Sequence, residues 1–180
     1  MNYFELFEIP VSIKVDKSLL NKKYVALQRK FHPDFFTQST ETEQADALEQ
    51  SSIINKAIKT LQNEDATIKY ILQLKGLLEE DEKYALPPDF LMEMMDLNEA
   101  DPADGKLQAV IYSNQIHSEI KPIIDQYDDT IITPEALLRL KEYYFKKKYL
   151  QRILDRIDGW RNIAARKDLW IVIKDLWFPS

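Results

Sequence analysis

The sequence predicts an all-α protein built from two helical parts. Apolar side chains recur at helical spacing through most of its 180 residues, and only three glycines are present to form tight turns. Residues 76–87 interrupt this pattern with a glycine, an acidic run and a proline. We therefore expect a helical hairpin with flanking helices over residues 1–75, an acidic linker over 76–87 and a three-helix bundle over 88–165.

The N-terminal part should begin with a short helix over residues 3–7 that Pro10 ends. A second helix over residues 17–31 follows Asp16, which is a favourable residue for its N-cap. Apolar side chains recur in this helix at i, i+4, i+7 and i+11, and they predict one buried face made of Leu20, Tyr24, Leu27 and Phe31.

Two further helices complete the N-terminal part. Thr40 and Glu43 have the spacing of a capping box, and they predict a helix that runs to about Gln62 with an inner face of Ala47, Ile54, Ile58 and Leu61. The polar run of residues 63–65 breaks this pattern, and another helix should cover residues 66–74.

The C-terminal part contains three long helical patterns, each with a proline at its first position as helices prefer. They begin at Pro88, at Asp101-Pro102 and at Thr133-Pro134, and the last continues beyond Trp160. Pro122 lies inside the second pattern and should kink or split that helix. The apolar tail over residues 166–180 is either an extra helix that covers the bundle or a self-association surface.

The composition limits the function. The chain has no cysteine, so disulfides, thiolate metal sites and cysteine nucleophiles are excluded. No apolar run approaches the ~20 residues that a membrane span needs, and the chain begins with a structured-looking segment in place of a signal or transit peptide. We expect a cytoplasmic protein with no cofactor and no membrane partner.

The net charge of −6 is unevenly distributed. Residues 76–105 carry ten acidic side chains and one basic one, whereas residues 17–30 have no acidic side chain and carry Lys17, Lys22, Lys23, Arg29 and Lys30. A basic stripe can bind phosphate, but this one is short and lacks outward-facing aromatic residues. An acidic partner protein is therefore favoured over nucleic acid.

The tripeptide His32-Pro33-Asp34 ends the basic helix. Its proline cannot continue the helix and disfavours helical geometry at the preceding residue, so the tripeptide should form a surface turn. Phe35 and Phe36 follow, and one or both should pack beneath the turn. A hydrolase that used His32 and Asp34 would need a nucleophile or a cofactor in reach, and none is nearby. A binding epitope is favoured over a catalytic site.

The predicted helix that begins at Pro88 has two apolar faces. At about 100° per residue, one face is an ordinary core stripe made of Phe90, Met94 and Leu97. A second face carries Leu91, Met92 and Met95, flanked by Asp96 and Glu99. It either packs against the N-terminal part or binds a client, because methionines adapt to a partner's shape and an apolar patch edged by acids suits protein recognition.

A basic amphipathic helix, a His-Pro-Asp turn, a polar loop and a second antiparallel helix together resemble a J domain. The resemblance extends to Tyr24 and Leu27 in the first helix and to residues 54–57 and Leu61 in the second. In J-domain proteins this region engages a DnaK-like ATPase and stimulates its ATP hydrolysis. The resemblance implies a chaperone-binding site of His32, Pro33, Asp34, Lys22, Lys23, Arg29 and Lys30. Phe35 stands where many J domains have a basic residue, so fewer charges remain for docking.

Over roughly residues 1–165 the chain looks like the HscB-type co-chaperones of iron–sulfur cluster assembly. The segments that carry this likeness are residues 1–7, the His-Pro-Asp turn, residues 70–76 and residues 90–93. In that family the C-terminal bundle binds an IscU-like scaffold through an apolar and acidic patch. The resemblance implies a scaffold-binding site of Leu91, Met92, Met95, Asp96, Glu99 and Tyr149.

The resemblance therefore implies a non-enzymatic co-chaperone. Such a protein delivers an IscU-like scaffold to an HscA/DnaK-like ATPase and stimulates that ATPase. The alternative is a J-domain co-chaperone that serves a different client protein.

Overall fold

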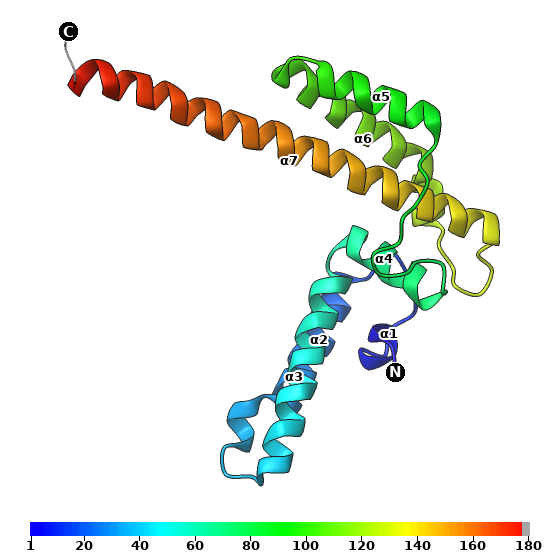
Figure 1. The fold of residues 1–180 in the computed structure, drawn as a ribbon. Coiled ribbons are helices and arrows are strands. Elements are labelled where there is room, and N and C mark those ends of the chain that lie inside the picture. Colours follow the sequence, from blue (N-terminus) through cyan, green and yellow to red (C-terminus); the bar gives the residue numbers. More distant parts are fainter. Residues whose placement is uncertain (178–180) are drawn as a thin grey trace. The chain divides into compact units, whose positions relative to one another are not determined.

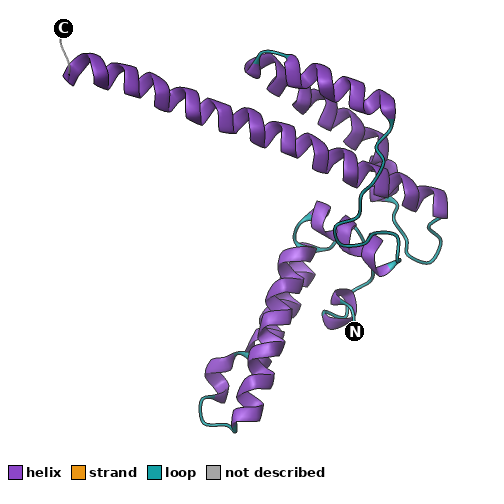
Figure 2. Cartoon of the chain, viewed as in Figure 1, coloured by secondary structure: helices purple, strands orange, loops and turns teal. Residues whose placement is uncertain are grey.

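The computed structural model describes residues 1–177, and side chains as far as Ile157. The regular secondary structure of this part of the chain is entirely helical, with no strand, as the sequence predicts (Figures 1 and 2). Seven α-helices and one 3₁₀ turn, η1, follow in the order α1 Tyr3–Leu6, α2 Lys17–Phe31, η1 Pro33–Phe36, α3 Glu41–Leu61, α4 Glu64–Leu74, α5 Pro88–Glu99, α6 Pro102–Asp125 and α7 Pro134–Trp177.

Local capping residues set the beginnings of α2, α3 and α4. The Asp16 carboxylate accepts hydrogen bonds from the first turn of α2 at 2.8 and 3.0 Å, and Thr40 and Glu43 form the predicted capping box of α3. Helix α4 begins two residues earlier than expected, because the Asn63 side chain accepts from the backbone N–H of Ala66 at 2.9 Å and so caps it.

Gly76 ends α4 in a left-handed conformation, with φ of +67°. The backbone N–H of Gly76 donates to the carbonyl of Gln73 at 3.0 Å, and that of Leu77 donates to the carbonyl of Leu72 at 2.9 Å. This pair of bonds is a Schellman motif, which satisfies carbonyls that the helix end leaves without partners. Residues with a Cβ pay a steric cost in this conformation, so a glycine suits the position.

Contacts along the chain define two units. In the first unit, α2 and α3 form an antiparallel hairpin (Figure 1), and the predicted inner face of α3 is buried. The ring of Tyr3 in α1 stacks on Tyr70 of α4 with centroids 4.2 Å apart. The fully buried apolar side chains of this unit include Phe4, Phe7, Leu20, Ile54, Ile68, Ile71 and Leu72.

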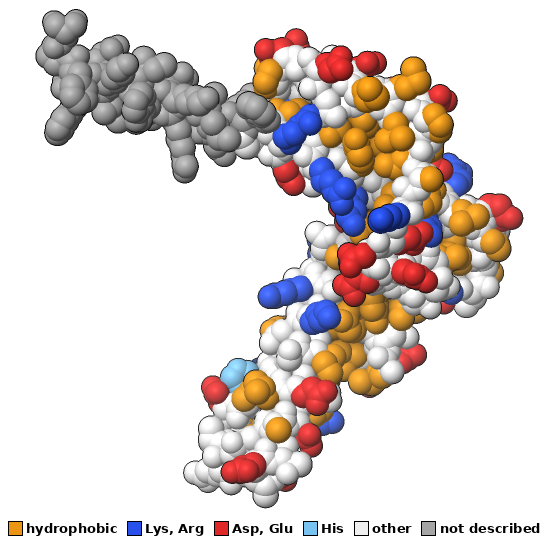
Figure 3. Space-filling view, viewed as in Figure 1, with side chains coloured by type: hydrophobic (Ala, Val, Ile, Leu, Met, Phe, Trp, Pro, Cys, Tyr) orange, Lys and Arg blue, Asp and Glu red, His pale blue; other side chains and the backbone are white. Residues whose placement is uncertain are grey.

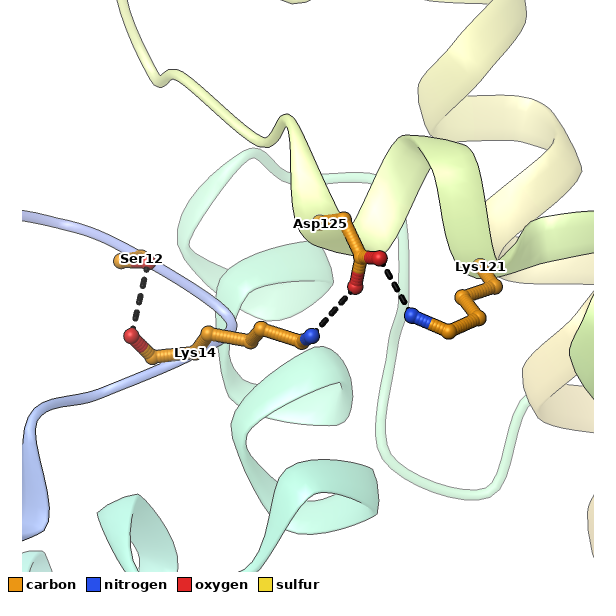
Figure 4. A network of polar contacts seen from close by, with 4 residues as sticks. All are labelled: Ser12, Lys14, Lys121 and Asp125. Carbon is orange, nitrogen blue, oxygen red and sulfur yellow. Dashed lines mark hydrogen bonds and ion pairs between the residues drawn. The ribbon is translucent and has the colours of Figure 1, made fainter.

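The first unit comprises residues 1–82 and also residues 121–141, where α6 ends and α7 begins. Asp125 accepts from both Lys14 and Lys121, and the hydroxyl of Ser12 donates to the backbone carbonyl of Lys14 at 3.2 Å (Figure 4). Two further ion pairs join this segment to residues 1–82: Lys75 with Asp129 at 2.8 Å and Lys141 with Glu82 at 2.5 Å. Glu82 of the predicted acidic linker is therefore in an ion pair.

The second unit comprises residues 83–120 and α7 from residue 142 onward. Its core is formed by one face of each helix, including Phe90, Met94, Leu97, Ala109, Ile116, Leu150, Ile153 and Ile157. At Gly105 a Cβ would lie 3.0 Å from the backbone carbonyl oxygen of Leu97. The glycine therefore permits the close approach of α6 to the end of α5.

The long helices α6 and α7 are both continuous. Pro122 does not split α6, which continues through it to Asp125. The proline removes the N–H that would bond the Ser118 carbonyl, but it stands in the last turn, so only three helical residues follow it. The backbone of the tail continues α7 as far as Trp177 and does not start a new helix. Residues 178–180 of the tail lie outside the described residues.

Candidate functional site

The His-Pro-Asp turn is held by its own backbone at the end of α2. His32 leaves helical geometry at φ −68° and ψ 128°, as expected for a residue that precedes proline. Its N–H donates to the carbonyl of Gln28 at 2.9 Å, and its carbonyl accepts from the N–H of Phe35 at 3.0 Å. His32 therefore ends α2 and begins η1 at once, which fixes the direction of the three side chains.

The side chains of the turn also contact one another. The backbone N–H of Asp34 donates to Nδ1 of His32 at 3.3 Å, so in the neutral ring the proton lies on Nε2. Nδ1 also lies 3.6 Å from a carboxylate oxygen of Asp34. Both side chains remain accessible, Asp34 more than His32.

Phe35 and Phe36 behave differently. Phe36 is half-buried, in line with the expectation that at least one of the two rings packs beneath the turn. Phe35 is 68% exposed, and its ring meets the His32 ring edge-on with centroids 6.0 Å apart. An apolar side chain thus stands at the surface beside the tripeptide.

The four predicted basic residues of α2 are not equivalent. Lys22, Arg29 and Lys30 are exposed, and the ammonium of Lys30 lies 4.9 Å from the ring centroid of Phe31. Lys23 instead forms an ion pair with Glu8, and this contact lowers the pKa of the Glu8 carboxyl. Lys23 therefore offers less free charge to a partner than the other three.

Asn55 of α3 braces the basic helix, a role that the sequence did not indicate. Its side-chain oxygen accepts from the Tyr24 hydroxyl and from the Gln28 amide, both at 2.9 Å. The carbonyl of Gln28 in turn receives the N–H of His32. The helical pattern of α3 could indicate that a polar residue faces a neighbouring helix, but sequence spacing alone does not predict which residues of that helix it bonds.

Helix α5 displays the two faces that the sequence predicts. Phe90, Met94 and Leu97 are buried, whereas Met92 and Met95 are 66% and 60% exposed and Leu91 is also exposed. Asp96 and Glu99 are exposed beside them. The five α5 residues, Leu91, Met92, Met95, Asp96 and Glu99, thus form one accessible surface, which we call the α5 patch.

Tyr149 of α7 stands next to α5. Its ring meets the buried Phe90 ring edge-on with centroids 5.9 Å apart, and the residue is half-buried. The structure therefore brings this more distant predicted site residue into the same unit as the α5 patch.

Two further observations concern the described residues. No group of three or more histidine, aspartate or glutamate side chains there is arranged to hold a metal ion. No helix there is long and apolar enough to cross a membrane.

Known proteins match the chain along most of its length. A co-chaperone protein HscB homologue of Vibrio cholerae is 42% identical over 171 residues, covering 88% of this chain and 100% of that protein. The human iron–sulfur cluster co-chaperone protein HscB is 31% identical over 160 residues, covering 87% of this chain and 67% of that protein. No protein-family model matches the sequence.

Solved structures agree with these sequence matches. The chaperone HscB of Vibrio cholerae superposes with a TM-score of 0.68 and 26% identity, covering 91% of this chain and 99% of that one. The crystal structure of the human co-chaperone protein HscB gives a TM-score of 0.72 at 26% identity, covering 89% of this chain and 82% of that one.

The fold and the His-Pro-Asp turn define a J-domain co-chaperone, in which the helical hairpin is joined to a second helical unit. Within that class, the chain belongs to the HscB family of co-chaperones.

Proposed function

We propose that this chain brings an IscU-like iron–sulfur scaffold to an HscA/DnaK-like chaperone and stimulates the ATPase of that chaperone. The human and mouse relatives are named iron–sulfur cluster co-chaperones, which supports the choice of pathway. The observation that carries the proposal is that one chain exposes two chemically different surfaces. One is polar and basic, at the end of α2, and the other is apolar and acidic, on α5.

The His-Pro-Asp turn and the basic side chains beside it are suited to bind a partner protein quickly and in one orientation. Lys22, Arg29 and Lys30 place exposed positive charge along α2, which speeds association with an acidic surface. Pro33 restricts the backbone between His32 and Asp34, so little backbone conformational entropy is lost when a partner binds their side chains.

The α5 patch suits a protein client. Its exposed methionines can adjust to the shape of a partner, and its apolar centre with an acidic rim has the composition of a protein interface. The buried face of the same helix fixes its position, so the patch is presented on a rigid element.

Carrying both surfaces on one chain raises the local concentration of the scaffold near the chaperone. In this proposal the co-chaperone performs no chemistry itself. ATP hydrolysis takes place on the chaperone, and His32 and Asp34 act as contacts that favour the hydrolysing state.

Two variants of the full-length chain test this function. His32→Gln should abolish stimulation of the chaperone ATPase in single-turnover assays and leave scaffold binding by calorimetry unchanged. Leu91→Ala combined with Met95→Ala should weaken scaffold binding and leave basal stimulation of the ATPase intact.

The alternative of a different client makes the opposite prediction for the second variant. If the wild-type chain stimulates the ATPase but binds no scaffold, or if the double variant binds scaffold as the wild type does, the client assignment is wrong. If His32→Gln still stimulates the ATPase, the chaperone assignment is wrong.

A further inference from the structure

Helices α5 and α7 run side by side and in the same direction through the second unit. The Phe90 ring near the start of α5 meets Tyr149, and near the end of α5 the side-chain oxygen of Asn98 accepts from the Arg156 guanidinium. Tyr149 and Arg156 are two turns apart in α7, so both lie on the face that borders α5. These two contacts mark the line where the helices meet, which we call the α5–α7 seam.

Arg152 lies on this seam between the two contacts. It is three residues after Tyr149 and four before Arg156, which places it on the same face of α7. The side chain is exposed. At this level α5 presents the stretch from Leu91 to Met95. Arg152, whose positive charge also acts on the Tyr144 phenol, therefore stands across the seam from the apolar centre of the α5 patch.

Acidic residues stand on the opposite side of the same patch. Asp96 is two residues from Asn98, which turns its side chain about 160° away from the α7 side of α5. Glu99 is exposed on the outer surface as well. Figure 3 shows hydrophobic side chains over α5 and the adjoining part of α7, with acidic side chains along the far edge of α5 and basic ones along α7.

We propose that the docking surface is polarised, with Arg152 as a specificity-determining residue on its basic side. Its partner segment carries apolar side chains that cover Leu91 and Met95, a cationic group that faces Asp96 and Glu99, and a carboxylate that faces Arg152. This assignment rests on the proposed function for the identity of the partner, which is the scaffold. The predicted site of apolar and acidic residues is then only part of the surface.

The polarity has a specific physical role. Apolar burial supplies binding energy but is non-directional, so Leu91 and Met95 alone accept a segment in either orientation. Opposite charges on the two sides reject the reversed orientation, because it sets like charges against each other. Arg152 thus selects the direction in which the scaffold segment lies across the patch.

A charge exchange in the full-length chain tests this directly. Asp96→Arg combined with Arg152→Asp keeps the net charge, the composition of the rim and the apolar centre, but reverses the polarity. Calorimetry with the IscU-like scaffold should show affinity reduced by about tenfold or more. Arg152→Gln alone should reduce it about two- to fivefold, with a weaker dependence on salt.

Asn114→Asp is the matched control for the single variant. It makes the same change of one charge unit at an exposed position of α6, and affinity should not change. Equal unfolding midpoints in thermal melts show that the variants are folded, and Arg152→Gln with its control decides the matter if the exchange variant does not fold.

If the exchange variant binds as the wild type does, or if Arg152→Gln and Asn114→Asp bind equally well, the surface is not polarised and the inference is wrong, whereas the proposed function stands. If the wild-type chain binds no scaffold, the proposed function fails first, and the partner assigned to this surface fails with it.

Discussion

The His-Pro-Asp turn and the α5 patch present their side chains by different means. In the turn, backbone hydrogen bonds between Gln28 and His32 and between His32 and Phe35 set the direction of a few polar side chains. In the patch the backbone is an ordinary helix, and the buried Phe90, Met94 and Leu97 fix its position. The turn depends on local conformation, whereas the patch depends on a core packed beneath it.

This difference determines how each surface can fail. Changes to the braces around the turn should impair chaperone stimulation with a modest loss of stability. On α5, neighbouring residues should have opposite effects, because one face carries the fold and the other remains available to a partner.

Met94→Ala and Met95→Ala separate the two faces of α5 and should differ most. Met94 is fully buried and Met95 is 60% exposed. Truncating the buried side chain leaves a cavity, and the free energy of unfolding should fall by about 2–5 kcal/mol. Truncating its exposed neighbour should change that free energy by less than about 0.5 kcal/mol. Urea unfolding followed by circular dichroism measures both values.

The same pair sharpens the assignment of the patch. Met95→Ala should lower affinity for the scaffold at unchanged stability, and Met94→Ala should retain it at temperatures where the variant is folded. A loss of stability in Met95→Ala as large as in Met94→Ala would mean that Met95 is packed in the native protein, and the contrast between the faces would not hold.

Asn55→Ala tests the brace of the turn and should have an intermediate effect. The variant loses the acceptor of two hydrogen bonds from α2, those of Tyr24 and Gln28. Each such bond contributes about 1 kcal/mol in general, and less where water replaces it. The unfolding free energy should fall by about 1 kcal/mol, and stimulation of the chaperone ATPase should fall although His32 is intact.

Lys56→Ala is the control for this change, because it truncates the next residue of α3, which is also exposed. It should leave stability near the wild-type value. Full stimulation of the ATPase by Asn55→Ala would mean that the turn keeps its conformation without the brace.

Features that depend on neighbouring residues were predictable. The caps at Asp16 and Thr40, the buried stripe of α3 and the two faces of α5 all follow from side-chain chemistry within a few turns of helix. The core stripe of α5 was predicted and is buried, whereas the sequence pattern left the use of the second face open.

Features that depend on distant pairs were not predictable. Glu8, which follows α1, pairs with Lys23 of α2 and so makes that lysine less available to a partner. Asn55 bonds two residues of α2 that are more than 25 positions away in the sequence. Residues 121–141 belong to the first unit, where Lys14 and Lys75 pair with carboxylates more than 50 residues later in the sequence. Periodicity does not encode such partners.

Residues 121–141 are held to the rest of the first unit partly by exposed ion pairs. Removing one of these ion pairs should have the smallest effect on stability. Lys121 and Lys14 donate to Asp125 and lower the pKa of its carboxyl below the ordinary value of 3.8. A carboxyl with a lowered pKa in the folded state stabilises the fold above its ordinary pKa, and that contribution is lost as the pH falls through the lowered value. These charges therefore contribute stability at neutral pH.

Asp125→Asn removes this contribution at every pH. The unfolding midpoint of the variant should therefore lie slightly below that of the wild type at pH 7. The difference between the two midpoints should vanish in strong acid and shrink in high salt, where exposed charges are screened. Thermal melts at pH 7 and in strong acid, with and without added salt, measure this. A difference that persists unchanged in acid would show that Asp125 acts through packing or neutral hydrogen bonds, and the contact would then resemble the core of α5 more than a charged surface.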